Sequence, residues 1–177
     1  MRDFYFIWEN SVNIRKIVIC FLALFTLWGC SPKTENLFDY QESAADYGAT
    51  LTIGGEVFDV IIHLDALEGG IRNAAAIEYL SPEEIKGYTV LRRGDEHYSR
   101  VGEIDIPVTA ESLPQLITVE ALFSLKAEDV SSVDVDGDGN TVVVCTSDGR
   151  EVTIVYLPDG ALSSMETSDG SFSLKFK

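Results

Sequence analysis

The side chains that could carry chemistry are few and scattered along the chain. The sequence of 177 residues holds three cysteines and two histidines, His63 and His97. A catalytic thiol needs a base such as histidine beside it, but Cys145 lies in a strand-like apolar run, 142–146, far in sequence from either histidine. A lone cysteine in such a run is most often a small buried hydrophobic residue. We therefore expect Cys145 to be structural, and each histidine to face solvent on its own strand rather than to bind a metal.

One acidic segment resembles a metal-binding motif. Asp134-Val135-Asp136-Gly137-Asp138-Gly139 has acids at alternate positions and a glycine at the sixth, like the first half of a calcium-binding loop. The twelfth position, where a bidentate glutamate belongs, is Cys145. An acidic hairpin loop is the favoured interpretation, and weak calcium binding by Asp134, Asp136 and Asp138 is the alternative. No other metal site and no cofactor is predicted.

Two other features have both a functional and a structural interpretation. Arg93-Gly94-Asp95 is the tripeptide that integrins read, but Gly-Asp also suits a hairpin turn, which is the favoured interpretation. Glu120 stands on the most apolar predicted helix, near Ile117 and Phe123, and faces either a pocket mouth or, as favoured, the one solvent-exposed stripe of that helix. Nucleophilic-serine motifs, phosphate-binding loops and recognisable catalytic carboxylate pairs are absent from the sequence. We therefore do not expect an enzyme.

A stretch near the N-terminus has the three parts of a secretory signal. The basic pair Arg15-Lys16 precedes the apolar run Ile17–Trp28, and the small residue Gly29 precedes Cys30. The run is shorter than the roughly 20 apolar residues that span a bilayer. Its end, with Leu27 three residues before the cysteine, resembles the lipobox of bacterial lipoproteins, although Trp28 replaces a residue that is usually small or β-branched. The resemblance implies that Cys30 becomes the lipidated N-terminus of the mature chain.

The signal sets the expected organisation of the chain. We assign residues 1–29 to a lipoprotein signal peptide, 30–47 to a lipidated N-terminus and tether with a possible short helix, and 48–177 to one folded domain. A diacylglyceryl group supplies two acyl chains, which hold a protein stably on a membrane. The expected location is therefore the extracytoplasmic side of the cell membrane, with the Cys30 lipid as the anchor. An uncleaved signal anchor and a plainly secreted protein are the alternatives.

The net charge of the chain excludes some partners. It is −16 overall, and because residues 1–29 contribute +1, the remainder carries −17. Nucleic-acid binding rests on basic surfaces, so no nucleic-acid partner is expected. The same charge opposes binding flat on an anionic membrane surface. Solubility at a crowded cell surface is the favoured role of the charge.

The elements that must position these side chains are mostly strands. Alternation of apolar and polar residues, with glycine-rich turns between the runs, predicts antiparallel neighbours. Four Asp-Gly pairs, spaced about ten residues apart, predict tight hairpins in the last third of the chain. The predicted segments are a hairpin over 49–64, a strand over 71–79, a short helical connector over 81–87, a hairpin of 88–92 and 97–101, an extended piece over 103–107, and strands over 141–146, 151–157, 162–167 and 171–177.

One apolar helix interrupts the strands. Ser112 and Gln115 have the spacing of a capping box with Pro114 in the first turn, which predicts a helix from Leu113 to about Lys126. The helix is apolar nearly all round, so it must be covered on several sides. In a domain otherwise made of strands, the natural cover is the concave face of a curved sheet. The expected fold class is α+β and mostly β, with a strongly curved antiparallel sheet, an incomplete barrel, around one main helix.

The order of these elements resembles a known group of proteins. The resemblance rests on Gly55-Glu56-Val57-Phe58, the connector Ser81–Gly87, Ile106-Pro107 before the helix, and the Asp-Gly meander, all behind a lipobox. This pattern is similar to the LolA-like lipoprotein carriers and the LprG/LppX-like lipoproteins, and covers roughly Tyr47–Phe176. The resemblance implies an acyl-binding cavity between sheet and helix, and no catalytic residues. LolA itself is soluble, whereas this chain is expected to be tethered.

Two functions remain open from the sequence. The first is a surface-tethered lipoprotein that binds a lipid or other hydrophobic ligand in a cavity between sheet and helix. The second is a non-enzymatic protein–protein interaction module with a fully packed core, and a protein partner at the cell surface. The helix residues expected to line the cavity in the first case are Leu113, Leu116, Ile117, Leu122 and Phe123.

Overall fold

The computed structural model describes residues 37–68, 71–147 and 149–177 of the chain. They belong to one compact unit, Thr34–Lys177. The predicted signal peptide 1–29, Cys30 and the start of the tether lie outside the described residues, as do Gly69-Gly70 and Asp148. The division of the chain at residues 29 and 47 therefore stays a prediction.

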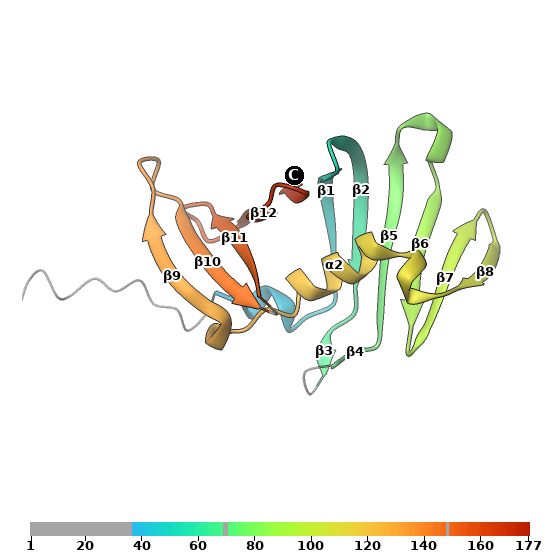
Figure 1. Ribbon diagram of the computed structural model, residues 1–177, viewed down its shortest axis with the longest axis horizontal. Helices are drawn as coiled ribbons and strands as arrows, with labels where there is room; N and C mark the ends of the chain where they lie inside the picture. Colours follow the sequence, from blue (N-terminus) through green and yellow to red (C-terminus); the bar gives the residue numbers. More distant parts are fainter. Residues whose placement is uncertain (1–36, 69–70, 148) are drawn as a thin grey trace, which may run out of the picture. The chain divides into compact units, whose positions relative to one another are not determined.

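Strands make up most of the described chain, with α2 (Pro114–Leu122) as its α-helix (Figure 1). Short 3-10 turns stand at Asp39–Gln41, Glu83–Ile85, Ala110–Ser112 and Ala127–Asp129. The strands are β1 (Ala45–Ile53), β2 (Glu56–Leu64), β3 (Leu67–Glu68), β4 (Ile71–Arg72), β5 (Ala74–Ser81), β6 (Tyr88–Arg93), β7 (Glu96–Val101), β8 (Ile104–Val108), β9 (Val130–Val135), β10 (Thr141–Ser147), β11 (Arg150–Tyr156), β12 (Leu162–Thr167) and β13 (Phe172–Phe176).

Eleven strands form one sheet in the order β8-β7-β6-β5-β2-β1-β13-β12-β11-β10-β9, while β3 and β4 form a separate small ribbon. All neighbours are antiparallel. Most are joined by short turns, but the centre is not: the first strand pairs with the last, with Leu51 opposite Leu174. We call this β1–β13 pairing the seam. It joins a first arm, β2 and β5–β8, to a second arm, β9–β12.

The hairpin turns follow the residues that the sequence placed in them. Gly54 and Gly55 lie between β1 and β2 with φ of 57° and 89°, and residues with a side chain rarely adopt such angles. The hairpins β6–β7, β10–β11, β11–β12 and β12–β13 form where they were predicted. The connector predicted at residues 81–87 is the 3-10 turn Glu83–Ile85.

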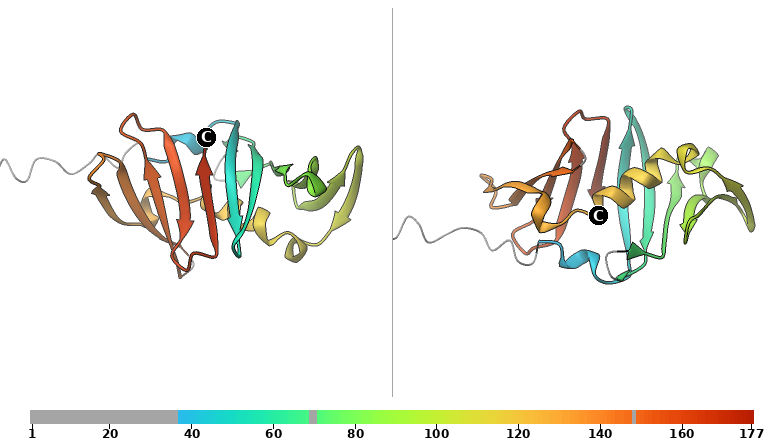
Figure 2. Two further views of the ribbon diagram at one scale, coloured as in Figure 1. Left: turned by 90° about the horizontal axis from the view of Figure 1, so that it is seen from above. Right: turned by 60° about the horizontal axis from the view of Figure 1, so that its bottom comes forward.

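Alternate strand residues point into a core on one face of the sheet. On β2, Val60, Ile62 and Leu64 are at most 4% exposed, and on the seam Leu51 and Leu174 are fully buried. The sheet bends, and α2 lies along its concave face (Figures 1 and 2). Because the sheet does not close, β8 and β9 stay as edges. The predicted class, a curved antiparallel sheet around one apolar helix, is confirmed.

The helix is shorter than predicted, and its capping box does not form. α2 ends at Leu122 rather than near Lys126, and Leu113 is its N-cap without a side-chain cap. Ser112 ends a 3-10 turn instead, where its hydroxyl lies 3.2 Å from that of Thr109. Pro114 does begin the helix, as predicted.

Tertiary contacts hold the chain where it leaves α2. The last carbonyls of a helix have no partner within it. Arg72 Nη2 donates to Phe123 O at 3.2 Å, and Gln41 Nε2 donates to Leu125 O at 3.0 Å. These two carbonyls lie just past α2, so Arg72 and Gln41 hold the chain that follows the helix; within its last turn, Ser124 Oγ donates to Glu120 O at 2.6 Å.

Three strand boundaries also differ from the prediction. β1 begins at Ala45 and runs through Gly48, whose carbonyl accepts from Lys177 N at 3.0 Å. The strand predicted over 71–79 is broken at Asn73 into β4 and β5. The edge strand β9 was not predicted, because its serines and aspartate give a weak apolar alternation.

Candidate functional site

The five helix residues predicted to line a cavity differ in their burial. Leu113, Leu116, Leu122 and Phe123 are at most 2% exposed and belong to the core cluster, whereas Ile117 is 42% exposed. The ring of Phe123 lies 5.1 Å from that of Tyr47 and 5.7 Å from that of Tyr40, centroid to centroid. None of the three hollows described below is lined by these five residues.

A first hollow, of about 570 Å³, lies at one end of the helix–sheet interior. The first turns of α2 form one side of it, and the ends of strands and hairpin turns form the other. We call it the rim hollow. Phe172, 5% exposed, both lines the hollow and belongs to the core, so the hollow reaches apolar interior. Polar residues line it as well. Its lining includes Ile53, Pro114, Thr118, Arg150, Asp169 and Phe172.

Asp169 organises one wall of the rim hollow. Its Oδ1 accepts from Ser171 N at 3.0 Å, from Ser171 Oγ at 2.7 Å and from Thr167 Oγ1 at 2.8 Å. These hydrogen bonds, the backbone one first, hold the pKa of Asp169 at about 2. The β12–β13 turn is therefore held in shape by one ionised carboxylate.

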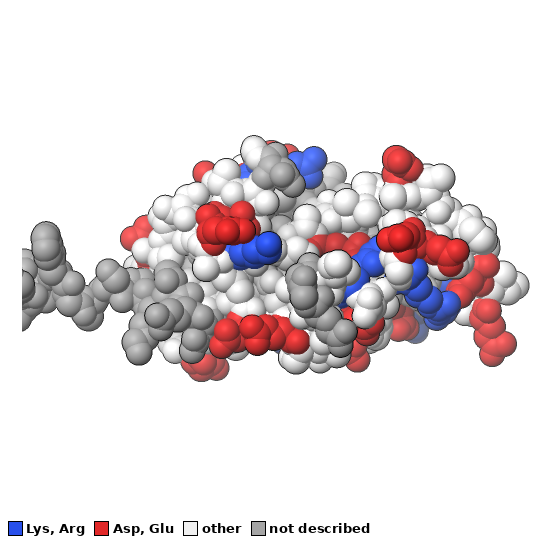
Figure 3. Space-filling model, turned by 90° about the horizontal axis from the view of Figure 1, so that it is seen from below, with Lys and Arg blue, Asp and Glu red and all other residues white. Residues whose placement is uncertain are grey.

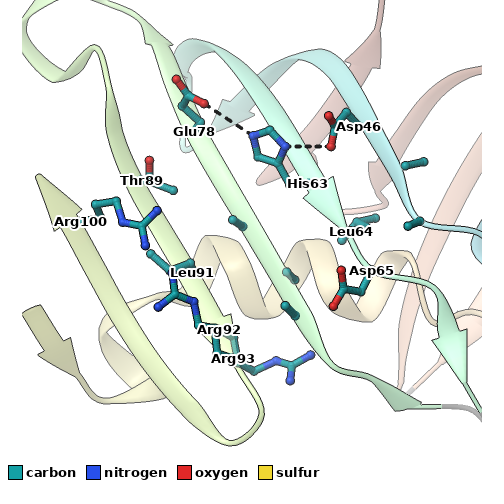
Figure 4. Close-up of a pocket in the computed structure, with 15 residues that line it drawn as sticks. Asp46, His63, Leu64, Asp65, Glu78, Thr89, Leu91, Arg92, Arg93 and Arg100 are labelled. Carbon is teal, nitrogen blue, oxygen red and sulfur yellow. Dashed lines mark hydrogen bonds and ion pairs between the residues drawn. The ribbon is translucent and has the colours of Figure 1, made fainter. Parts of the chain in front are cut away.

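A second hollow, of about 600 Å³, lies on the sheet face that points away from α2 (Figure 4). We call it the outer hollow. The small side chains of Ala74 and Ala76 on β5 form the bottom of this hollow, and charged residues lie on both sides of it. His63 Nδ1 lies 2.8 Å from Asp46 Oδ1, and its Nε2 lies 3.6 Å from Glu78 Oε2. Three neighbouring strands are thus linked through one imidazole.

The opposite side of the outer hollow carries arginines that are already paired. Asp105 accepts from Arg100 Nε at 2.6 Å and from Arg93 Nη1 at 3.0 Å, and the Arg100 hydrogen bond lowers the pKa of Asp105. An imidazole held by a carboxylate can act as a base. Among the described residues that line this hollow none is a serine, cysteine or lysine, and Thr89 supplies a hydroxyl group.

A third hollow, of about 390 Å³, lies where α2 ends, and we call it the arginine hollow. It contains the ion pair between Arg92 and Glu120, whose side chains are each 16% exposed. Arg92 Nε donates to Glu120 Oε1 at 2.7 Å, and Arg92 Nη2 donates to Arg72 O at 2.7 Å. The favoured prediction for Glu120, a solvent-exposed stripe, was therefore wrong, and the pocket-mouth alternative describes its position. The lining comprises Ile71, Arg72, Arg92, Gly94, Asp95, His97, Glu120 and Ser124.

Arg72 is the most enclosed cation of the described chain, at 5% exposed. Its guanidinium donates to two backbone carbonyls, Asp65 O and Phe123 O. Burial lowers the pKa of this arginine. No sequence signal pointed to Arg72, because the contacts that bury it come from the distant residue Phe123 and from a break in the strand at Asn73.

The predicted calcium residues lie at the β9–β10 hairpin. Asp136 Oδ1 accepts from the backbone nitrogens of Asp138 and Asn140, both at 2.9 Å. Hydrogen bonds from Asn140, the side chain first, lower the pKa of Asp136. Within the described residues, no group of three or more His, Cys, Asp or Glu is placed to hold a metal ion. The loop is therefore built around Asp136 as an acceptor for its own donors.

Three other predictions concern single residues. Cys145 is fully buried, and burial raises the pKa of its thiol to about 11, as expected of a structural residue. Arg93-Gly94-Asp95 forms the end of β6 and the turn before β7, as expected. His97 differs from the prediction of a solvent-facing residue, because its Nε2 is buried in the arginine hollow. It points to the concave side, under the end of α2.

Comparisons with known proteins find similar folds at low sequence identity. No protein-family model matches the chain, and a search of curated proteins finds no match. A LolA superfamily protein from Nitrosomonas europaea is 12% identical, with 81% of this chain and 90% of that chain covered and a TM-score of 0.41. Lipoprotein LppX from Mycobacterium tuberculosis is 14% identical over 82% of this chain and 95% of that chain, with a TM-score of 0.40. A structure of the CwlD amidase in complex with the GerS lipoprotein, from Clostridioides difficile, matches at 16% identity over 84% and 95%, with a TM-score of 0.43.

LolA-like and LppX-like proteins, which the sequence resembles, are thus among the structures found. At these identities the likeness concerns the fold and not the function. Among the described residues, no helix is both long and apolar enough to cross a membrane.

Proposed function

We propose that this chain is a lipoprotein tethered through Cys30 to the extracytoplasmic side of the cell membrane, and that it binds a lipid or other hydrophobic ligand without catalysing a reaction. The observation that carries the ligand proposal is the rim hollow, which reaches the core residue Phe172 between α2 and the strand ends. Its volume of about 570 Å³ lies within the usual range of ligand sites, roughly 300–1,000 Å³.

The polarity of the rim hollow suits an amphiphile better than a plain hydrocarbon. The apolar lining residues Ile53, Pro114 and Phe172 would contact an acyl or ring portion. Polar groups of Thr118, Arg150 and neighbouring turns also line the hollow and would contact a headgroup. The buried leucines of α2 would form the wall behind the ligand and not the contact surface.

The ligand proposal is tested by identifying any apolar molecule that co-purifies with the protein. Residues 31–177 are purified without detergent, and circular dichroism first establishes a folded, strand-rich domain. Native mass spectrometry followed by solvent extraction should then reveal an apolar species in near-stoichiometric amount, or its uptake when a fatty acid or phospholipid is added. A clean mass with no uptake would overturn the proposal.

Two tryptophan variants on α2 locate the ligand. Thr118→Trp would fill the rim hollow and should abolish uptake. Ile117→Trp places the same side chain one residue away, at a position that is 42% exposed and outside the hollow, and should leave uptake unchanged. Loss of uptake in Ile117→Trp alone would move the site to the other side of the helix.

The tether has its own test. Cys30→Ala removes the thiol that the lipid requires, and should shift the protein from the membrane fraction to the soluble fraction or leave the signal uncleaved. Metabolic labelling with an alkyne fatty acid should mark the unchanged chain and not the variant. Equal labelling of both would refute lipidation at Cys30.

A second candidate function, a protein-interaction module, is favoured by one specific observation. Val101, Ile104 and Ile106 at the β7–β8 end of the sheet are 58%, 68% and 48% exposed. Register places all three on the concave face, beyond the part that α2 covers. Pro107 on the edge strand has no N–H, which limits pairing with a further strand, so a partner would dock on the side chains.

The double variant Ile104→Lys/Ile106→Lys tests this surface. Cross-linking at the cell surface should yield a defined adduct with the unchanged chain and lose it in the variant. Val57→Lys changes an apolar residue of similar exposure, 59%, on another part of the sheet, and is the matched control. Loss of the adduct in the control as well would contradict a role for the β8 surface.

A further inference from the structure

Two buried side-chain nitrogens have no hydrogen-bond partner within the described residues, and both belong to the arginine hollow. They are Nε of Arg72 and Nε2 of His97. Buried polar groups are nearly always paired, and each exception calls for an explanation. Because Arg72 on β4 and His97 on β7 line the same hollow, two hydrogen-bonding groups without partners lie at one site.

The charge of Arg72 is also incompletely compensated. Among the described residues no carboxylate forms an ion pair within 4 Å of its guanidinium, although Glu120 and Asp65 favour its charged form from further away, and the guanidinium donates to the carbonyls of Asp65 and Phe123. The Phe123 carbonyl lies at the C-terminal end of α2, where the helix dipole is negative, and offsets part of the charge. A buried cation without a paired anion is unfavourable, so a negative group bound there would stabilise the arrangement.

The surroundings add positive charge. Arg92 is the second guanidinium of the hollow, and Glu120 is the carboxylate paired with it. The other two arginines of β6 and β7, Arg93 and Arg100, line the outer hollow instead, where they pair with Asp105. Figure 3 shows basic atoms gathered over this end of the sheet, bordered by acidic ones. In a chain of net charge −16, the hollow brings two guanidinium groups together, with the carboxylates of Glu120 and Asp95 also in its lining.

We propose that the arginine hollow binds a phosphate group, held by Arg72, Arg92 and His97. Donors that approach from β4, β6 and β7 suit an acceptor with several oxygens, and guanidinium groups match phosphate geometry well. At about 390 Å³ the hollow has room for the phosphate and part of the molecule that carries it. Neighbouring atoms shield the two unpaired nitrogens, so binding turns the Arg72 or His97 side chain toward the ligand.

The site is separate from the rim hollow, because no residue lines both. Failure of either proposal therefore leaves the other intact. The full chain, in neutral detergent micelles, is labelled with nitrogen-15 and titrated with inorganic phosphate at constant ionic strength. The Nε–H signals of the arginine side chains report directly on the groups concerned.

The expected result is a saturable movement of the Arg72 and Arg92 signals, with Arg150 at the other end of the sheet unmoved. Arg72→Lys should weaken phosphate binding about tenfold, since one charge-assisted contact is worth roughly that factor. If Arg72→Lys does not fold, His97→Gln provides the second variant, and should weaken binding with the fold retained. Arg100→Gln, on the outer face, is the control and should bind as the unchanged chain does.

A second titration, with glycerol 1-phosphate, distinguishes the two sources of the group. Tighter binding than that of inorganic phosphate would identify a lipid headgroup or similar ester, and equal or weaker binding would identify the free anion. No saturable change, or equal movement of all arginine signals, would overturn the proposal. Unaltered binding in both Arg72→Lys and His97→Gln would overturn it as well.

Discussion

Cys145 shows how completely the core encloses a side chain that could otherwise react. It is fully buried on β10, where its neighbour across the strand pair is Val152. Burial raises the pKa of the thiol to about 11, and the thiolate is the reactive form. A residue that the sequence offered as a possible nucleophile is therefore both shielded and protonated at neutral pH.

We expect Cys145 to be inert toward thiol reagents in the folded protein. In a chain with Cys20 and Cys30 replaced by serine, modification by an aromatic disulfide reagent should be absent at pH 8 over hours, and complete within minutes in denaturant. Fast modification without denaturant, at a rate independent of protein stability, would show that the thiol is accessible and would contradict the packing described.

Asp169 gives the fold a defined acid sensitivity. The pKa of Asp169 in the folded protein, about 2, lies below the ordinary aspartate pKa of about 3.9. The ionised carboxylate therefore contributes fully to stability above about pH 3.9, and this contribution is lost as the pH falls through the folded-state pKa. Asp169→Ala should lower the melting temperature at pH 6, and the difference from the unchanged chain should shrink toward pH 2. A difference that is constant from pH 6 to pH 2 would contradict a role for the charge.

Single polar residues were the hardest to place from sequence. His97 and Glu120 were expected in solvent, yet both line the arginine hollow. Arg72 and Arg92 were not singled out at all. The reason is that their positions depend on pairs far apart in the chain, such as Arg72 with Phe123 and Arg92 with Glu120. Residue type and local spacing carry no information about such partners.

At the scale of elements, α2 depends on the sheet for its stability. It has nine residues, and isolated helices shorter than roughly 12–15 residues are marginal in water. Leu116, Val119, Leu122 and Phe123 are buried against the sheet, so packing stabilises the helix and no side-chain cap is needed at its start. The apolar character of the segment predicted this cover correctly.

Adjacent residues of α2 should therefore respond very differently to truncation. Leu116→Ala removes a side chain with no exposed surface and should cost about 2–5 kcal/mol of unfolding free energy. Ile117→Ala, at 42% exposed, should cost about 1 kcal/mol or less. Urea unfolding followed by circular dichroism measures both. Equal losses would mean that Ile117 is covered in solution, for example by a partner or a second copy.

Hairpins were predictable where turn chemistry and alternation agreed. The Asp-Gly and Gly-Gly turns fixed the pairs β1–β2, β11–β12 and β12–β13, because few residues adopt the required backbone angles. Strand β9 was not predicted, because an edge strand is paired on one side only and tolerates serine and aspartate. The capping box failed because Ser112 is already part of a 3-10 turn.

At the scale of the molecule, the seam is what local sequence could not predict. The pairing of β1 with β13 joins the two ends of the described chain, with Ala49 opposite Phe176 and Ile53 opposite Phe172. Nothing within either strand specifies the other. Only the need to cover the buried face of α2 with a single curved sheet requires that the first arm and the second arm meet.

One continuous sheet implies that the two arms unfold together. Leu174 has no exposed surface at the seam, and Leu174→Ala should cost about 2–5 kcal/mol. Amide hydrogen exchange should then show protection lost by the same amount on β6, in the first arm, and on β11, in the second, because global opening exposes both.

Val143→Ala, fully buried on β10, is the matched change inside the second arm. If the sheet is one cooperative unit, this variant lowers the protection of β6 as much as that of β11. If it lowers protection on β9–β12 alone, the arms open separately. The seam would then be a hinge between two units, and the rim hollow, which is lined by α2, the ends of the seam strands and residues of the second arm, could change its volume without unfolding of either arm.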